Sequence, residues 1–156
     1  MHRLTIALAL ALPLCAQQDK AAAVPKVVFV CEHGAAKSVI AAKELEKLAR
    51  ERGIQVQAVA RGTAPEPEIG AAVRQGLKAD GIDIGNMTPV RVQAGDLRNA
   101  ATVVAFGPDL SAVAGGKIKA EDWSATPAPS EDFRAARDYI VKRLQPLLDQ
   151  LAAAKR

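Results

Sequence analysis

The sequence predicts one α/β domain, in which a short, mainly parallel sheet is flanked by helices on both faces. From Lys26 onward, short runs of β-branched residues alternate with segments of helical periodicity, a pattern typical of parallel sheets with helical crossovers. The chain has 156 residues and is 49% hydrophobic, which is enough for one full-sized core. Because no repeat or linker divides it, residues 24–156 are assigned to a single domain.

The first half of this domain alternates regularly. Residues 27–30 form a continuous apolar run, which indicates a buried strand, and apolar residues then recur at helical spacing over 38–52. Gly53 ends that helix, and residues 55–60 alternate polar and apolar side chains as a second strand. The next helix is predicted to open over 65–68, where Glu66 and Glu68 give it an acidic first turn, and to run to Gly81.

The central region is less regular. Residues 82–92 read as an irregular connection with a turn at Pro89, and 96–100 as a short helical turn. A third buried strand is predicted over 102–106. Residues 107–129 are loop-rich, and a short fourth strand is expected near 117–119.

The last predicted element is a long helix. Ser130 is expected to cap it, with Glu131 and Asp132 in its first turn and apolar residues along one face as far as Leu151. Pro146 lies inside this pattern and is expected to kink the helix, because proline removes a hydrogen bond at a cost of about 3 kcal/mol.

Residues 1–23 have the pattern of a secretory signal peptide. His2 and Arg3 precede an apolar run over 4–12 that is too short to span a bilayer. Cleavage is expected within the window 16–23, and an uncleaved N-terminal anchor is the alternative; lipid attachment at Cys15 is disfavoured by the bulky Leu14 before it. We therefore expect a periplasmic or secreted protein without stable membrane insertion after cleavage.

Charge and cysteine content narrow the function classes. The 21 lysines and arginines exceed the 17 acidic residues by only four and form no basic block, so no nucleic-acid partner is expected. Two cysteines exclude a disulfide-rich scaffold and a four-thiolate zinc site, and we predict no metal and no cofactor. If Cys15 leaves with the signal, Cys31 is the one thiol of the exported domain.

Residues 31–38 (Cys-Glu-His-Gly-Ala-Ala-Lys-Ser) carry the chemistry. They lie between the first predicted strand and the first predicted helix, where backbone N–H groups and the helix dipole bind an oxyanion and stabilise a thiolate. Cys31 is the candidate nucleophile, Lys37 supplies a cation, and the hydroxyl of Ser38 can donate to the sulfur. The residues expected to surround the oxyanion are Glu32, His33, Gly34, Ala35, Ala36 and Lys37.

This loop resembles the signature of the low-molecular-weight protein tyrosine phosphatases and their arsenate reductase relatives. In that signature a strand is followed by Cys, five residues, Arg and Ser or Thr, and here Cys31 and Ser38 keep the spacing. Downstream, Arg61-Gly62-Thr63 and Gly81-Ile82-Asp83 are similar to further family motifs, and Trp123 precedes a proline-containing loop as in the arsenate reductases. The likeness extends over 26–151 and implies the family's α/β fold.

Two departures concern the catalytic groups that the resemblance implies. Lys37 stands at the position of the family's arginine, which replaces a planar two-point donor by a point charge. The family's general acid is an Asp before a Pro, and the matching dipeptide here is Thr126-Pro127. Threonine cannot protonate a leaving group, so Asp122 and Asp132 are the candidate general acids.

Three functions are compatible with these residues. The first is a thiol-based phosphatase that hydrolyses a phosphate ester through a cysteinyl-phosphate on Cys31. The second is a non-catalytic domain that binds an oxyanion, and the third is an arsenate reductase that uses an external thiol. In each case the partner is a phosphate-like oxyanion or a phosphorylated substrate. A large aryl substrate is not strongly indicated, because Trp123 is the one aromatic side chain expected near the loop.

Overall fold

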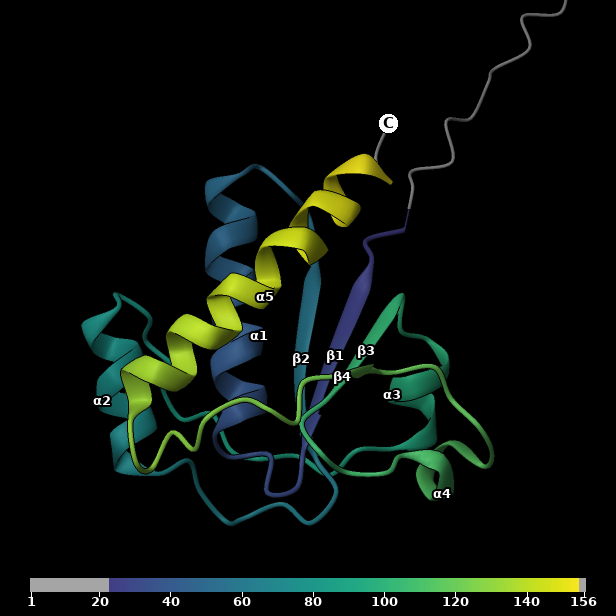
Figure 1. The fold of residues 1–156 in the computed structure, drawn as a ribbon, viewed down its shortest axis with the longest axis horizontal. Coiled ribbons are helices and arrows are strands. Elements are labelled where there is room, and N and C mark those ends of the chain that lie inside the picture. Colours follow the sequence, from purple (N-terminus) through teal and green to yellow (C-terminus); the bar gives the residue numbers. More distant parts are fainter. Residues whose placement is uncertain (1–22, 155–156) are drawn as a thin grey trace, which may run out of the picture.

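The computed structural model of the chain describes residues 23–154 and contains a four-stranded parallel sheet (Figure 1). Neighbouring strands pair in the order β2-β1-β3-β4, and all three pairings are parallel, as predicted. The strands are β1 (Lys26–Cys31), β2 (Gln57–Gly62), β3 (Thr102–Ala105) and β4 (Glu121–Asp122).

In the part of the chain that the structure describes, five helices cover the two faces of this sheet, which confirms the predicted architecture. The apolar side chains of α1, α2 and α5 pack in one core cluster, and those of the α3 and α4 region pack in a second. The helices are α1 (Lys37–Glu51), α2 (Ala71–Ala79), α3 (Ala94–Arg98), α4 (Ser111–Ala114) and α5 (Phe133–Ala153).

Strand β1 contributes to both clusters, because successive side chains of a strand point to opposite faces. Val27 and Phe29 lie in the cluster with α1 and α5, whereas Val28 and Val30 lie in the cluster with α3. All four side chains are fully buried, and the burial of each favours folding by about 1.5–3 kcal/mol. This central position explains the continuous apolar run and fixes the end of β1 in the middle of the sheet edge.

The predicted start of the second helix is wrong. Helix α2 begins at Ala71 and has no acidic residue in its first turn, whereas the sequence pattern placed its start over 65–68. Pro65 and Pro67 have no N–H to donate, and the amide of Glu66 donates instead to the carbonyl of His33 at 3.0 Å. The segment before α2 is therefore extended along the loop after β1 and does not enter the helix.

Two predictions near the C-terminus are also corrected. The fourth strand is a two-residue pairing at Glu121–Asp122 and not at 117–119. The cap of α5 is Asp132, whose carboxylate accepts from the amide of Ala135 at 2.9 Å, so that Ser130 and Glu131 precede the helix. Helix α5 continues through Pro146 as a single element.

The predicted signal peptide, apart from residue 23, lies outside the described residues. Among residues 23–154, none of the helices combines the length and the apolar composition that a membrane span requires.

Candidate active site

The candidate site begins where β1 ends. Cys31 is the last residue of β1, Lys37 is the first of α1, and the loop over 32–36 joins them at the carboxyl edge of the sheet. The Cys31 side chain is only 7% exposed. Its Sγ accepts a hydrogen bond from the amide of Gly34 at 3.2 Å and lies 3.2 Å from the Oγ of Ser38. A backbone N–H that donates and a hydroxyl that can donate or accept therefore lie against the sulfur.

Gly34 holds this loop against the end of β2. It has a φ of +63°, a conformation that side chains other than glycine rarely adopt. A Cβ atom on Gly34 would lie 2.8 Å from the amide nitrogen of Gly62, and one on Gly62 would lie 2.6 Å from that of Gly34. Both contacts are with backbone, which cannot move aside as a flexible side chain does. The two glycines therefore permit a backbone approach that no other residue allows.

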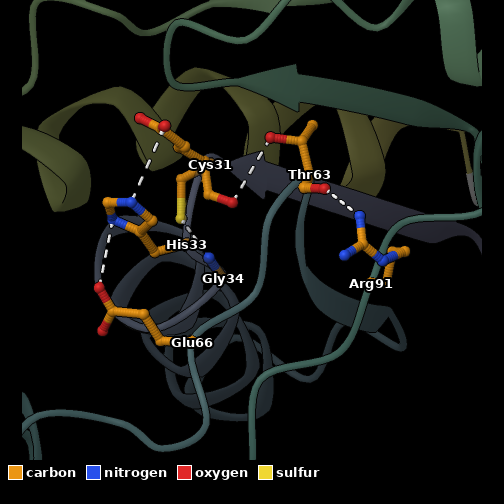
Figure 2. A network of polar contacts seen from close by, with 7 residues as sticks. Cys31, His33, Gly34, Thr63, Glu66 and Arg91 are labelled. Atoms are coloured by element: carbon orange, nitrogen blue, oxygen red, sulfur yellow. Dashed lines mark hydrogen bonds and ion pairs between the residues drawn. The ribbon is translucent and has the colours of Figure 1, made fainter.

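Backbone hydrogen bonds from the segment after β2 complete the support of the loop. The amide of Thr63 donates to the carbonyl of Cys31 at 3.1 Å, and the amide of Ala64 donates to that of Glu32 at 2.8 Å. Further out, the guanidinium of Arg91 donates to the carbonyl of Thr63 at 2.5 Å (Figure 2). The carbonyl groups of Cys31 and Glu32, at the start of the loop, thus accept from the segment after β2.

A cavity of about 420 Å³ opens over this loop. The walls combine the loop with the segment before α2, the end of β3 and the segment before α5. Its lining residues are Cys31, Glu32, His33, Ala35, Ala36, Lys37, Glu66, Gly70, Ala72, Val73, Phe106, Ala128, Pro129 and Ser130. This cavity is lined by all but one of the loop residues that are expected to surround the oxyanion. The exception is Gly34, whose amide donates to the sulfur of Cys31.

The electrostatics of this cavity favour an anion at its base. Ala36 precedes α1 without a side-chain cap, so no side-chain acceptor occupies the first-turn amides, and the helix dipole adds positive potential there. Within residues 23–154, no carboxylate lies within ion-pair distance of Lys37. A half-buried cation at a helix N-terminus is unfavourable by itself and becomes favourable with an anion beside it.

The rim of the cavity carries a histidine between two carboxylates. Nδ1 of His33 lies 3.4 Å from Oε1 of Glu66, and Nε2 lies 3.8 Å from Oε1 of Glu32 (Figure 2). All three side chains are about half exposed or more.

The two carboxylates considered as general acids do not line this cavity. Asp122 borders a different cavity next to residues 107–110. Hydrogen bonds from the backbone N–H and the hydroxyl of Ser124 hold the pKa of Asp122 below its usual range, so it is a carboxylate with no proton to donate at neutral pH. The carboxylate of Asp132 caps α5.

Three other residues from the sequence analysis also have structural partners. Trp123 is 1% exposed and packs against the rings of Phe29 and Phe106 at centroid distances of 5.9 and 5.8 Å, so it belongs to the core and does not form a wall of the cavity. The hydroxyl of Thr126 is buried and donates to the carbonyl of Trp123 at 2.7 Å. Arg61 points to Asp96, with two hydrogen bonds at 3.0 and 3.1 Å.

Sequence reasoning did not include Glu66, Phe106 and Ser130 in the site, although all three line the cavity. The sequence pattern assigns Glu66 to the first turn of a helix and Phe106 to a buried strand, and both interpretations rest on local pattern alone. Their place at the cavity depends on the pairing of β1 with β2 and β3, which the periodicity of one segment does not reveal. In residues 23–154, no group of three or more metal-ligating side chains is arranged to hold a metal ion.

Comparisons with known proteins place the fold. A family model described as "PTS system, Lactose/Cellobiose specific IIB subunit" matches residues 26–73, from β1 into α2, and so does not reach β3 or α5. No curated protein matches the chain in sequence.

Solved structures match over most of the chain. YfkJ from Bacillus subtilis has a TM-score of 0.71 at 19% identity, over 85% of this chain and 98% of its own. A thioredoxin-dependent arsenate reductase from Corynebacterium glutamicum has a TM-score of 0.70 at 23% identity, over 86% of this chain and 65% of its own. A low-molecular-weight protein tyrosine phosphatase from Streptococcus pyogenes has a TM-score of 0.69 at 18% identity, over 82% and 93%. The chain therefore has the fold of these phosphatases and arsenate reductases.

Proposed function

We propose that this chain, which has the fold shared by low-molecular-weight phosphatases and arsenate reductases, is a thiol-based phosphatase. The observation that carries the proposal is the environment of Cys31. Its Sγ has two hydrogen-bonding neighbours at 3.2 Å and lies at the base of a cavity into which the N-terminus of α1 and Lys37 direct positive potential. A buried thiol whose only role is to fill the core needs neither an anion site nor a lysine beside it.

In the proposed reaction, Sγ of Cys31 attacks phosphorus and the ester oxygen leaves, which forms a cysteinyl-phosphate. Water then attacks phosphorus, the sulfur leaves as a thiolate, and inorganic phosphate is released. The first-turn amides of α1 and the ammonium group of Lys37 hold the non-reacting phosphate oxygens. The hydroxyl of Ser38 donates to the sulfur and so stabilises the thiolate when it leaves.

The substrate is a phosphate monoester with a leaving group that does not require an aromatic pocket. Phe106 is the aromatic residue among the cavity-lining side chains, and the other lining residues above the loop are small or polar. Binding of a phosphate-like group is supported separately by a solved neighbour with this fold, Wzb of Vibrio vulnificus, whose structure is a complex with benzylphosphonate.

The test is hydrolysis of para-nitrophenyl phosphate by the purified protein and by Cys31→Ser. We expect the serine variant to lose at least about a thousandfold in kcat/KM, because an unactivated hydroxyl replaces a thiolate. Lys37→Arg should raise turnover, because a guanidinium grips two phosphate oxygens at once. Equal, background-level rates for the wild type and Cys31→Ser would exclude the phosphatase. Reduction of arsenate should be assayed in parallel with an external thiol added. The thiol is needed because Cys31 is the single cysteine of residues 23–154.

A second candidate is an oxyanion-binding domain without catalysis. The observation in its favour is Thr126, which occupies the position of the expected acid and whose hydroxyl is turned inward to the Trp123 carbonyl. For such a domain, Lys37→Arg would leave turnover at background, while phosphate, sulfate or arsenate would still raise the melting temperature. A ligand at a hundred times its Kd adds about 2.7 kcal/mol of stability, which a thermal shift measures readily.

Export to the periplasm or the medium is part of the proposal and rests on residues 1–23. Expression of the full chain with a C-terminal tag, followed by fractionation and N-terminal sequencing, tests it. We expect a mature N-terminus within the window 16–23 in the exported fraction. A tagged protein that keeps Met1 and stays with the cytosolic fraction would contradict export.

A further inference from the structure

The proposed hydrolysis needs a proton donor that the late part of the chain does not supply. When Sγ attacks phosphorus, the ester oxygen leaves with an electron pair and must be protonated unless it is an unusually good leaving group. Asp122 borders another cavity and Asp132 caps α5. The donor must therefore come from the side chains that do line the cavity over Cys31.

Among the lining residues, four have side chains that exchange protons besides Cys31: Glu32, His33, Lys37 and Glu66. An imidazole exchanges its proton near neutral pH, whereas solvent-exposed carboxyl groups are already ionised there and an ammonium group keeps its proton. Glu32 and Glu66 are 71% and 50% exposed. Chemistry alone thus favours His33 as the donor.

The geometry around His33 supports this role. Its backbone is fixed by the hydrogen bond from the amide of Glu66 to its carbonyl at 3.0 Å. Its side chain and that of Cys31 line the same cavity, and the carboxylates of Glu32 and Glu66 lie on its two ring nitrogens. The contact of Nδ1 with Glu66, at 3.4 Å, is closer than that of Nε2 with Glu32, at 3.8 Å (Figure 2). Glu66 is therefore the nearer partner of the ring, at Nδ1, and Nε2 has the looser contact.

The charged groups around the ring come from three elements. Two carboxylates flank it, one from the loop and one from the segment before α2, and Lys37 on α1 is the cation of the same cavity. From the segment before α5, Ala128, Pro129 and Ser130 line the cavity and bring no charge. A phosphate bound at the base of the cavity adds further negative charge. The imidazole is thus the one side chain on this cavity wall that both gives up and takes back a proton readily.

We propose that His33 is the general acid of this site and that Glu66 is its positioning residue. The inference rests on the proposed phosphatase function and adds a catalytic residue to it. In the first step the S–P bond forms, the P–O bond breaks, and the ester oxygen takes the proton of Nε2. In the second step the neutral imidazole accepts a proton from the attacking water as the O–P bond forms and the P–S bond breaks. Phosphate is released, and the imidazolium and thiolate are restored.

The experiment compares two substrates that differ in their need for an acid. Para-nitrophenolate leaves without protonation, whereas the alkoxide of glycerol phosphate does not. For His33→Gln, we expect kcat/KM on glycerol phosphate to fall about a hundredfold or more, and kcat/KM on para-nitrophenyl phosphate to change little. An equal fall on both substrates, or no fall on either, would overturn the proposal. Asp122→Asn is the matched control and should leave both values unchanged.

A pH profile gives a second measurement that does not depend on a variant that folds. For the wild type, the ratio of kcat/KM on glycerol phosphate to that on para-nitrophenyl phosphate should decrease as the pH rises, because loss of the ring proton removes the donor that only the poor leaving group needs. In Glu66→Gln this ratio should be lower than in the wild type at the same pH, since the ring loses its nearer contact at Nδ1. A ratio that does not change with pH contradicts the role of His33. Absence of any Cys31-dependent hydrolysis of para-nitrophenyl phosphate is a different result, which removes the phosphatase and the acid together.

Discussion

The loop after β1 and the long segment between β3 and α5 differ in how their polar groups are satisfied. In the loop over 32–36, the carbonyls of Glu32 and His33 accept from amides about thirty residues away, in the segment after β2. In the segment over 107–132, the side-chain oxygens bond to neighbours two or three residues along: Asp109 to Ser111, Asp122 to Ser124, Thr126 to Trp123 and Asp132 to Ala135. Long-range contacts thus fix the loop that carries the candidate nucleophile. The other segment satisfies its own carboxylates locally and presents none of them to the cavity.

The largest effect is expected when the close contact between the backbones of Gly34 and Gly62 is disrupted. We expect Gly62→Ala to lower the free energy of unfolding by about 3 kcal/mol, because its Cβ would lie 2.6 Å from the backbone nitrogen of Gly34. Anion binding and Cys31-dependent hydrolysis should be lost with it. Urea denaturation and a thermal shift with phosphate measure both effects.

Gly95→Ala is the matched control for this variant. Gly95 lies inside α3, and an added Cβ there would meet no atom within 4 Å. Alanine should therefore leave anion binding intact and raise stability by up to about 1 kcal/mol, through its better helix propensity. If Gly62→Ala behaved like Gly95→Ala, the close approach of the two loops would not be what holds the anion site.

A smaller loss of stability is expected when the ion pair between Arg61, near the end of β2, and Asp96 is removed. Burial of the Asp96 carboxyl raises its pKa, but hydrogen bonds from the Arg61 guanidinium and the Gln93 amide outweigh burial and leave the pKa lowered. Because the folded-state pKa is lowered, the stabilisation is present above the ordinary pKa of an aspartate, about 4, and is lost as the pH falls through the lowered value.

Asp96→Asn should therefore cost about 1–2 kcal/mol at pH 7, and this cost should shrink as the pH is lowered below about 4. Urea denaturation of both proteins between pH 7 and pH 3 measures it. A difference that stays constant over that range would show that the charge of Asp96 does not stabilise the fold.

The smallest loss of stability is expected from a substitution in the segment over 107–132. Asp132→Ala removes the side-chain cap of α5 and should cost about 1 kcal/mol of stability. It should leave kcat/KM unchanged for both good and poor leaving groups, because the carboxylate does not line the cavity. A selective loss on glycerol phosphate would instead make Asp132 the general acid and would remove the contrast between the two regions.

Much of the fold follows from local pattern. The continuous apolar run of β1 is buried on both faces, and the periodic segment after it is α1, within one residue of its predicted start. The position of Cys31 at the turn between them follows from the same two patterns. Elements whose ends depend on neighbours were less predictable: Ser130 and Asp132 are both suitable caps, and the choice between them depends on where α5 packs.

The candidate site divides in the same way. The sequence by itself determined where the loop with Cys31 lies, because a strand and a helix flank it, and a strand-to-helix turn of this kind is where the proposed anion site would form. Only the tertiary structure decided which side chains surround it. Pairing of β1 with β2 brings Glu66 to His33, and local hydrogen bonds hold Asp122 and Asp132 elsewhere. The physical reason is that backbone periodicity is a local property, whereas the partner of a charged side chain depends on contacts between distant segments.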